Sequence, residues 1–200
     1  MAKERLKSPR ARLFVALDLP AQVRAGIVAW GQEALSDPAL RRLTPESLHI
    51  TLAFLGYRPE REIGRLAQIV AESGRPAPRI ALEDPVPVPA RGRARLFALP
   101  ANSPGAVSLQ AEVQERLVAA QLYEPEKRPF WPHVTVARVR REKRGSARPA
   151  PVSRPPGALP QVLLQPFDGV RVTLYRSKIK PQGAEYAPLA QVELSEDGRQ

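Results

Sequence analysis

The sequence predicts an α+β fold of two pseudo-symmetric lobes, each an antiparallel sheet with helices on its outer face, enclosing a central cleft. Two observations favour this fold. The chain repeats its own pattern of strand, helix and strand, and both of its histidines fall at the same place in the repeat. A duplicated unit that meets its copy face to face creates a cleft on the pseudo-twofold axis. We expect one bilobal domain over 1–200, because 200 residues suit a single shared core.

The repeat is marked by two independent landmarks. The segments "ARLFVALDLP" (11–20) and "ARLFALP" (94–100) share their opening and their Leu-Pro end, at an offset of 83 positions. His49 and His133 lie 84 positions apart, within "SLHITLAFLG" and "FWPHVTVARVR". Two landmarks with nearly the same spacing indicate a duplicated structural unit.

The first unit predicts a strand at 11–20, then a helix, then a histidine strand at 47–56. The helix follows from apolar residues at helical spacing (Val23, Ile27, Trp30), and a second helix at 60–72 follows from the same spacing (Ile63, Leu66, Ile69). A strand is expected at 79–84. The segment 85–93 reads as the crossing between the halves, since its alternating prolines cannot sit inside a central strand.

The second unit predicts a strand at 94–100, a helix carrying Leu109, Val113 and Leu117, and the histidine strand at 130–140. The segment 140–160 is too rich in Pro and Arg for regular structure, so we expect a long exposed loop. The remaining strands are expected at 162–167, 169–177 and 186–194, and residues 1–10 are expected to be flexible.

The composition limits the possible functions. The chain has no cysteine, which excludes disulfides, thiolate nucleophiles and the commonest zinc sites. It has no apolar run long enough to span a membrane and no recognisable secretion signal, so we expect a cytoplasmic protein without a membrane partner. A formal net charge of +11 attracts polyanions such as RNA. The basic excess can equally be a solvated surface of a chain with an Arg-, Pro- and Ala-rich composition.

Each histidine begins a pattern of histidine, aliphatic residue, threonine and aliphatic residue. Because side chains alternate along a strand, His49 and Thr51 share one face, as do His133 and Thr135. Threonine occurs at only four positions, so a chance origin of both pairs is improbable. Two imidazoles and two hydroxyls around one cleft suit a tetrahedral phosphorus, with one imidazole as base and the other as acid. That scheme requires no metal or cofactor, and both imidazoles should then lie within about 5–8 Å of each other.

These motifs resemble the two-histidine phosphoesterase superfamily. Together with "RLFVALDLP" and "LYRSKIKPQGAEYAPL", they resemble its RNA 2',3'-cyclic phosphodiesterases of the LigT type, formerly called 2'-5' RNA ligases, over about residues 11–194. The resemblance implies hydrolysis of a 2',3'-cyclic phosphate to a 2'-phosphomonoester without metal. It implies that His49 is the proton donor and His133 the acceptor, while Thr51 and Thr135 bind the phosphate. Spacing alone leaves the two histidine roles interchangeable.

Three further residues are candidates for substrate binding. Arg138 follows His133 by five positions, where similar enzymes carry a phosphate-binding arginine, but strand alternation places it on the opposite face unless the strand bulges near Ala137. Phe97 and Phe14 occupy matching places in the repeat, and either can stack on a base. Tyr186 is expected to be structural.

Alternative functions use the same residues. They are 2'-5' RNA ligation, which puts a ribose hydroxyl in place of water, and non-catalytic RNA binding. A metallohydrolase is disfavoured because Glu46 and Asp18 form no recognisable ligand spacing with the histidines. We expect a monomer whose partner is an RNA with a 2',3'-cyclic phosphate end or a small cyclic nucleotide. One departure from similar enzymes is the proline-rich stretch at 149–160, where they usually continue into a helix.

Overall fold

The computed structural model describes residues 9–73, 76–180 and 183–195. Most of the segment expected to be flexible, 1–10, therefore lies outside the described residues. The strands are β1 (Arg10–Asp18), β2 (Leu40–Arg42), β3 (His49–Pro59), β4 (Arg79–Leu82), β5 (Val86–Val88), β6 (Leu96–Asn102), β7 (His133–Val139), β8 (Phe167–Asp168), β9 (Arg171–Lys180) and β10 (Gly183–Glu193). The helices are α1 (Ala21–Ala34), α2 (Ile63–Glu72), α3 (Pro104–Ala119) and α4 (Gln161–Leu164), with 3-10 turns η1 (Pro45–Ser47) and η2 (Glu60–Glu62).

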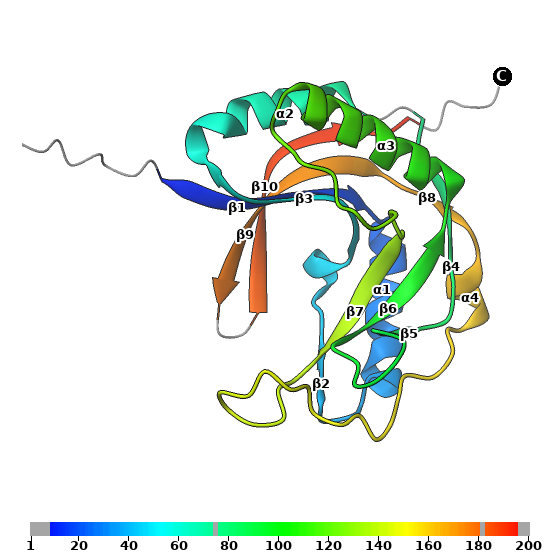
Figure 1. Ribbon diagram of the computed structural model, residues 1–200. Helices are drawn as coiled ribbons and strands as arrows, with labels where there is room; N and C mark the ends of the chain where they lie inside the picture. Colours follow the sequence, from blue (N-terminus) through cyan, green and yellow to red (C-terminus); the bar gives the residue numbers. More distant parts are fainter. Residues whose placement is uncertain (1–8, 74–75, 181–182, 196–200) are drawn as a thin grey trace, which may run out of the picture.

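The strands join in one strongly curved antiparallel sheet, with the order β10-β9-β1-β3-β7-β6-β4-β8. Strands β10, β9, β1 and β3 form the first lobe, and β7, β6, β4 and β8 form the second (Figure 1). The two lobes are connected where Ile50 of β3 pairs with Val134 of β7, the two residues that follow the histidines. The α+β fold with two related lobes is confirmed, and the repeat units meet at their histidine strands.

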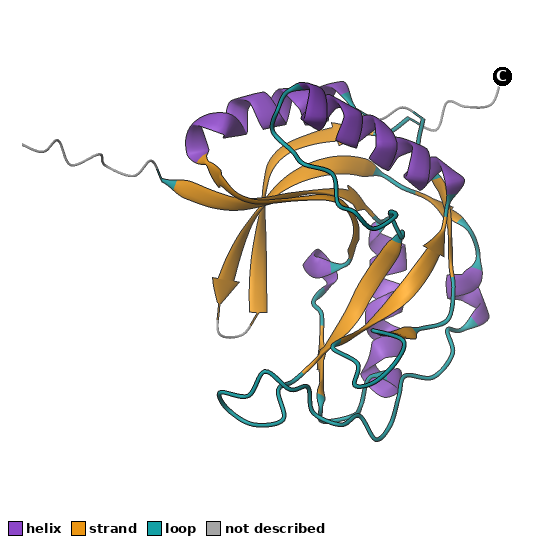
Figure 2. Cartoon of the chain, viewed as in Figure 1, coloured by secondary structure: helices purple, strands orange, loops and turns teal. Residues whose placement is uncertain are grey.

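The helices lie on the outside of the curved sheet (Figure 2). Helix α2 packs against β9 and β10, and α3 packs beside α2 and against β3 and β4. Helix α1 follows a first-lobe strand but packs on the second lobe, where its Ile27 lines one groove with Leu48 and Val136. Among the described residues, the inner, concave face therefore carries no α-helix but only the 3-10 turn η1, and the histidine side chains lie on this face.

The prediction of a strand at 162–167 is wrong. Residues Gln161–Leu164 form a single helical turn, and only Phe167 and Asp168 pair with β4. Prolines at positions 160 and 166 bracket the segment, and a proline nitrogen cannot donate to a ladder. Leu163 is buried over Gly26 of α1, where an added Cβ would lie 2.7 Å from Leu163 Cδ2. The glycine thus lets α4 pack closely on α1.

Two short strands were not predicted. The crossing at 85–93 contains β5, which pairs only with β6 and tolerates its alternating prolines as an edge strand. Strand β2 pairs with the end of β7 and carries Arg41 and Arg42 beside the cleft. Three-residue strands have too few positions for an alternating pattern to identify them.

The proline-rich loop at 140–160 is irregular, as predicted, and it is fastened to the second lobe by Asp37. The carboxylate of Asp37 is buried and accepts hydrogen bonds from the backbone N–H groups of Arg154, Ala39 and Ser153, each 2.8 Å long, and from the Ser153 hydroxyl at 2.9 Å. These donors lower the pKa of Asp37 to about 2. The loop is therefore held by a carboxylate that stays charged at any pH near neutrality.

No helix within the described residues is long and apolar enough to cross a lipid bilayer.

Candidate active site

The two histidine strands present their polar side chains to one cavity on the concave face. His49 and Thr51 of β3 and His133 and Thr135 of β7 all line this cavity, which has a volume of about 490 Å³. The intervening Ile50 and Val134 are fully buried on the other side of the sheet. The predicted alternation therefore holds in both strands, because each aliphatic pair has a core to fill.

The pairing of Ile50 with Val134 explains how the four groups come together. These residues are 84 positions apart and lie opposite each other, so they mark the pseudo-twofold axis. Antiparallel pairing then places His49 next to Thr135 and His133 next to Thr51, and the histidines become diagonal neighbours. Diagonal neighbours have Cβ atoms about 7–8 Å apart. The imidazoles approach one cavity from two sides, as a mechanism with two proton-transfer groups requires.

A bulge in each histidine strand changes the direction of the side chains beyond the threonines. In β7, Thr135 pairs with Ala98 and Ala137 pairs with Phe97, so Val136 is an extra residue. The bulge turns Arg138 to the concave face, where it lines the cavity. The strand thus bulges next to Ala137, which is the condition for Arg138 to share a face with His133. In β3 the equivalent extra residue is Leu52.

The expected equivalence of Phe14 and Phe97 is wrong. In the first lobe Phe14 pairs with Phe54, which lines the cavity, whereas the counterpart pairing in the second lobe joins Leu96 to Arg138. The sequence repeat is therefore one residue out of step with the structural repeat, and a one-residue shift turns a side chain to the other face of a sheet. Phe97 is 4% exposed and belongs to the hydrophobic core, so we withdraw it as a base-stacking residue.

His49 lies among aromatic rings in the first lobe. Phe14 stacks on its imidazole with ring centroids 5.0 Å apart, and the ring of Tyr186 meets it edge-on at 5.5 Å. Phe14 is therefore covered by protein side chains, and it stacks on His49 instead of on a nucleobase. Burial lowers the pKa of His49 to about 4; Asp18 opposes this shift, while His133 and Arg138 add to it. The Nδ1 atom is buried and has no hydrogen-bond partner among the described residues.

His133 has a different environment. Its Nδ1 lies 2.8 Å from the backbone oxygen of Trp131, and the indole of Trp131 stacks on the imidazole at 4.3 Å with an interplanar angle of 19°. A carbonyl oxygen can only accept, so Nδ1 carries the proton and, in neutral His133, Nε2 keeps a free lone pair. Burial lowers the pKa of His133, and the bond to Trp131 partly opposes this shift.

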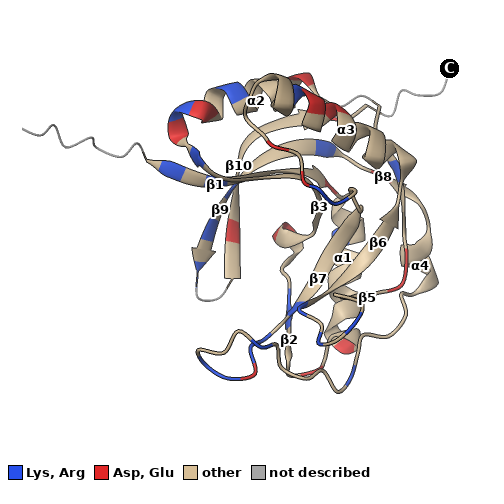
Figure 3. Ribbon diagram, viewed as in Figure 1, with Lys and Arg blue, Asp and Glu red and all other residues tan. Residues whose placement is uncertain are grey.

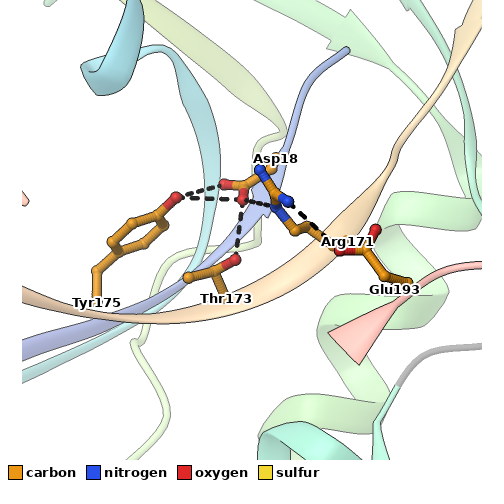
Figure 4. A network of polar contacts seen from close by, with 5 residues as sticks. All are labelled: Asp18, Arg171, Thr173, Tyr175 and Glu193. Carbon is orange, nitrogen blue, oxygen red and sulfur yellow. Dashed lines mark hydrogen bonds and ion pairs between the residues drawn. The ribbon is translucent and has the colours of Figure 1, made fainter. Parts of the chain in front are cut away.

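A buried carboxylate lies opposite His49. Asp18 of β1 is the register partner of His49, is 4% exposed, and accepts hydrogen bonds from Thr173 at 2.8 Å, from Arg171 Nε at 2.8 Å and from the Tyr175 hydroxyl at 3.0 Å (Figure 4). Arg171 also contacts Glu193 at 3.3 Å. The network holds one positive and two negative charges, and the carboxylate beside His49 favours the protonated imidazole.

We predict that Asp18→Asn lowers the pKa of His49 further, because the imidazole loses the carboxylate that opposes its low pKa. Glu193→Gln is the matched control, since it removes a carboxylate from the far side of Arg171 and leaves Asp18 in place. Both variants are measured by NMR titration of the histidine rings and by thermal unfolding. An unchanged His49 pKa with a lowered unfolding temperature would mean that Asp18 only joins β1 to β9.

The cavity is electropositive. Five cationic side chains are among the described residues that line it, and no carboxylate is; the cations are Arg12, Arg41, Arg42, Arg138 and Lys180. Figure 3 shows Lys and Arg positions on β9, and also on β2 with the loop after β7. Such a lining attracts anions, and phosphate in particular. Within the part of the chain that the structure describes, no group of three His, Cys, Asp or Glu residues could hold a metal ion.

Sequence reasoning missed Asp18, Trp131 and Tyr175 as parts of the site. Asp18 falls in "ARLFVALDLP", but the second copy of this landmark, "ARLFALP", has no carboxylate and the structural counterpart of Asp18 is Pro100, so no repeated motif marks it. Trp131 lies two residues before His133, but its contribution is a backbone oxygen and a ring face, which no motif records. Tyr175 joins the site only through strand pairing, opposite Phe14.

Comparisons with known proteins are consistent across sequence and structure. Residues 19–157 match the family model described as the 2'-5' RNA ligase superfamily. The chain is 34% identical over 202 residues to the RNA 2',3'-cyclic phosphodiesterase of Thermus thermophilus, covering 94% of this chain and 93% of that protein. It is 28% identical to the RNA 2',3'-cyclic phosphodiesterase of Escherichia coli, covering 92% and 97%.

Solved structures give the same result. A crystal structure of a Thermus thermophilus protein superposes with a TM-score of 0.74 at 29% identity, covering 93% of this chain and 99% of that chain. The crystal structure of E. coli LigT complexed with 3'-AMP superposes with a TM-score of 0.71 at 27% identity, with the same coverage. Each likeness therefore extends over both lobes.

Proposed function

Because the chain belongs to the 2'-5' RNA ligase superfamily, we propose that it is a hydrolase of RNA 2',3'-cyclic phosphate ends and releases 2'-phosphomonoesters by acid–base catalysis without a metal. The observation that carries this proposal is the meeting of two imidazoles and two threonine hydroxyls in one cationic cavity. We further propose that residues 1–200 act as one bilobal unit, as a monomer in the cytoplasm.

His133 is the proposed base. Its Nδ1–H is engaged by the Trp131 carbonyl, so the unprotonated Nε2 is the atom left to accept a proton. In the proposed step a water oxygen attacks the phosphorus, its proton passes to Nε2, and the bond from phosphorus to the 3'-oxygen breaks. The contacts with Trp131 also fix the orientation of the His133 imidazole, which lowers the entropic cost of reaching the reactive geometry.

His49 is the proposed acid, which gives a proton to the departing 3'-oxygen and leaves a 3'-hydroxyl and a 2'-phosphate. The low pKa that burial gives His49 disfavours this role, because an acid must be protonated. A bound phosphodiester carries a negative charge, and a negative charge nearby favours the imidazolium. The substrate together with Asp18 therefore supplies the electrostatic support that His49 needs.

The remaining lining groups are proposed to hold the phosphate. Thr51 and Thr135 donate their hydroxyl hydrogens to the two non-bridging oxygens, and the Arg138 guanidinium stabilises the added negative charge. Phe54, which is 57% exposed and occupies the place equivalent to Arg138, offers an open ring beside the phosphate site. One lobe thus presents an aromatic ring where the other presents a cation.

The direct test is incubation of the purified protein, in EDTA, with an RNA that ends in a 2',3'-cyclic phosphate. A 2'-phosphate end supports the proposed function. A 2'-5' linked product would instead assign ligation, a reaction that replaces water by a ribose hydroxyl. An unchanged end with retained binding would identify a non-catalytic RNA-binding protein, and loss of activity that Mg²⁺ or Zn²⁺ restores would contradict a metal-free mechanism.

A second prediction concerns pH. The rate should fall at low pH, where the base His133 becomes protonated, and at high pH, where the acid His49 becomes neutral. Because bound phosphate raises the pKa of His49, the basic limb of kcat should lie at higher pH than the basic limb of kcat/KM, which reports the free enzyme. Steady-state rates on one cyclic substrate from pH 4 to 9 give both profiles. Coincident basic limbs would show that substrate charge does not act on His49.

A further inference from the structure

A row of exposed side chains continues along β3 beyond the cavity. Phe54 is 57% exposed and lines the cavity, and Tyr57, which does not line it, is 59% exposed. Tyr57 stacks on no other ring among the described residues. Besides Phe54 and Tyr57, Trp131 is the one further exposed aromatic residue among the residues that the structure describes. Large exposed aromatic rings cost solvation energy, so a row of them beside a cationic cavity is a sign of a binding surface.

A second bulge in β3 brings Tyr57 to the concave face. Phe54 pairs with Phe14 and Gly56 pairs with Leu13, so Leu55 is an extra residue. Gly56 has a φ of +66°, a left-handed conformation that glycine adopts without steric cost. Without this bulge Gly56, and not Tyr57, would lie opposite Arg12 on the concave face. With it, Tyr57 lies opposite Arg12, in the same row as His49, Thr51 and Phe54.

Unpaired cations accompany this row. Arg12 lines the cavity and donates to the Ser177 hydroxyl at 3.5 Å, and Arg10 donates to the backbone oxygen of Tyr57; neither forms an ion pair with a carboxylate among the described residues. The acidic turn η2 directly follows β3, and its Glu60 and Glu62 form ion pairs with Arg176 at 2.9 Å and Arg58 at 2.7 Å. The row therefore keeps a net positive charge.

The spacing suits single-stranded nucleic acid. Phe54 and Tyr57 are opposite residues two apart on β1, which corresponds to about 7 Å along the strand. This is about twice the ~3.4 Å rise of stacked bases along one strand of a duplex. Two rings at this spacing hold successive bases that are spread apart, while Arg12 opposite Tyr57 and Arg10 two positions further along β1 meet the phosphates, as in sequence-tolerant single-strand binding.

We propose that Tyr57, Arg12 and Arg10 form a subsite for the nucleotides upstream of the cyclic end, so that an RNA chain is a better substrate than a mononucleotide. This inference rests on the proposed function. The penultimate base stacks on Tyr57, the phosphate that joins it to the terminal nucleotide binds Arg12, and the next phosphate upstream binds Arg10. The strand leaves the cavity along β1 and β3.

The test compares kcat/KM for a 2',3'-cyclic mononucleotide, dinucleotide and trinucleotide at equal ionic strength. The dinucleotide should exceed the mononucleotide by about 10–100-fold, the usual effect of one base–aromatic stack. Tyr57→Ser should abolish this gain and leave hydrolysis of the mononucleotide unchanged, whereas Tyr57→Phe, which keeps the ring, should retain it. Val118→Ser, which removes an exposed apolar side chain from α3, is the matched control and should change neither value.

Charge is tested separately with the trinucleotide. Arg10→Gln should reduce the slope of log kcat/KM against log salt by about one, and Arg65→Gln on the exposed surface of α2 should leave the slope unchanged. Equal kcat/KM for the mononucleotide and the dinucleotide would overturn the subsite while the proposed function stands. A gain that Tyr57→Ser does not affect would also overturn it. Failure to hydrolyse any of the three substrates would overturn both proposals.

Discussion

Replacing His49 with alanine should slow hydrolysis of an ordinary cyclic phosphate by about 10²–10⁴-fold, the usual contribution of a positioned acid or base. His133→Ala should cause a loss of similar size for a different reason. Without His49 the 3'-oxygen must depart as an alkoxide, whereas without His133 the water must attack without a base. Both variants should fold, because the aliphatic neighbours Ile50 and Val134, which fill the core beneath the histidines, are unchanged.

A 3'-bridging sulfur separates the two roles. Sulfur departs readily as a thiolate and needs no proton, so His49→Ala should recover most of its rate on this substrate, and His133→Ala should not. Rescue of His133→Ala alone would reverse the assignment of acid and base. If neither variant is rescued, both histidines chiefly position the phosphate, and the proposal of acid–base catalysis by this pair is wrong.

Replacing Thr51 or Thr135 with valine should lower kcat by about 10²–10³-fold, the cost of losing one donor to a developing oxyanion. Valine keeps the shape and removes only the hydroxyl, so KM for the ground state should change much less. Thr44→Val is the control, because Thr44 also lines the cavity but lies outside the histidine strands. A loss confined to KM, with kcat unchanged, would mean that the hydroxyls bind substrate and transition state equally.

The sequence predicted the parts of the fold that are repeated or strongly patterned. The two histidine strands, the helices after each Leu-Pro and the irregular 140–160 loop all follow from periodicity or composition. The strand expected at 162–167 failed because an apolar run between two prolines fits a strand and a helical turn equally well, and the packing of Leu163 on Gly26 decided between them. Strand β2 was too short to leave a pattern.

The site was predictable only where residues belong to a motif. The meeting of His49, Thr51, His133 and Thr135 in one cavity follows from the repeat, because related residues face each other across the axis. The bulges were not visible in the sequence, and each changes which side chains share a face. The bulge at Val136 turned Arg138 toward the cavity, so counting alternate positions gave the wrong face for this residue. Phe97 lies in the core because the sequence repeat is one residue out of step with the structural repeat.

Ile50 and Val134 are equivalent residues that pair with each other, which makes an isologous contact, the kind found at the centre of a symmetric homodimer. One copy of the unit carries a single imidazole and a single hydroxyl at this place, so it holds only half of the site. Two separate copies would have to dimerise to bring the full set together, and carrying both units in one chain removes the concentration dependence of that assembly. Two units of one chain can also differ in sequence, and the aromatic ring of Phe54 at the place equivalent to the charged Arg138 is a difference that a symmetric homodimer cannot have.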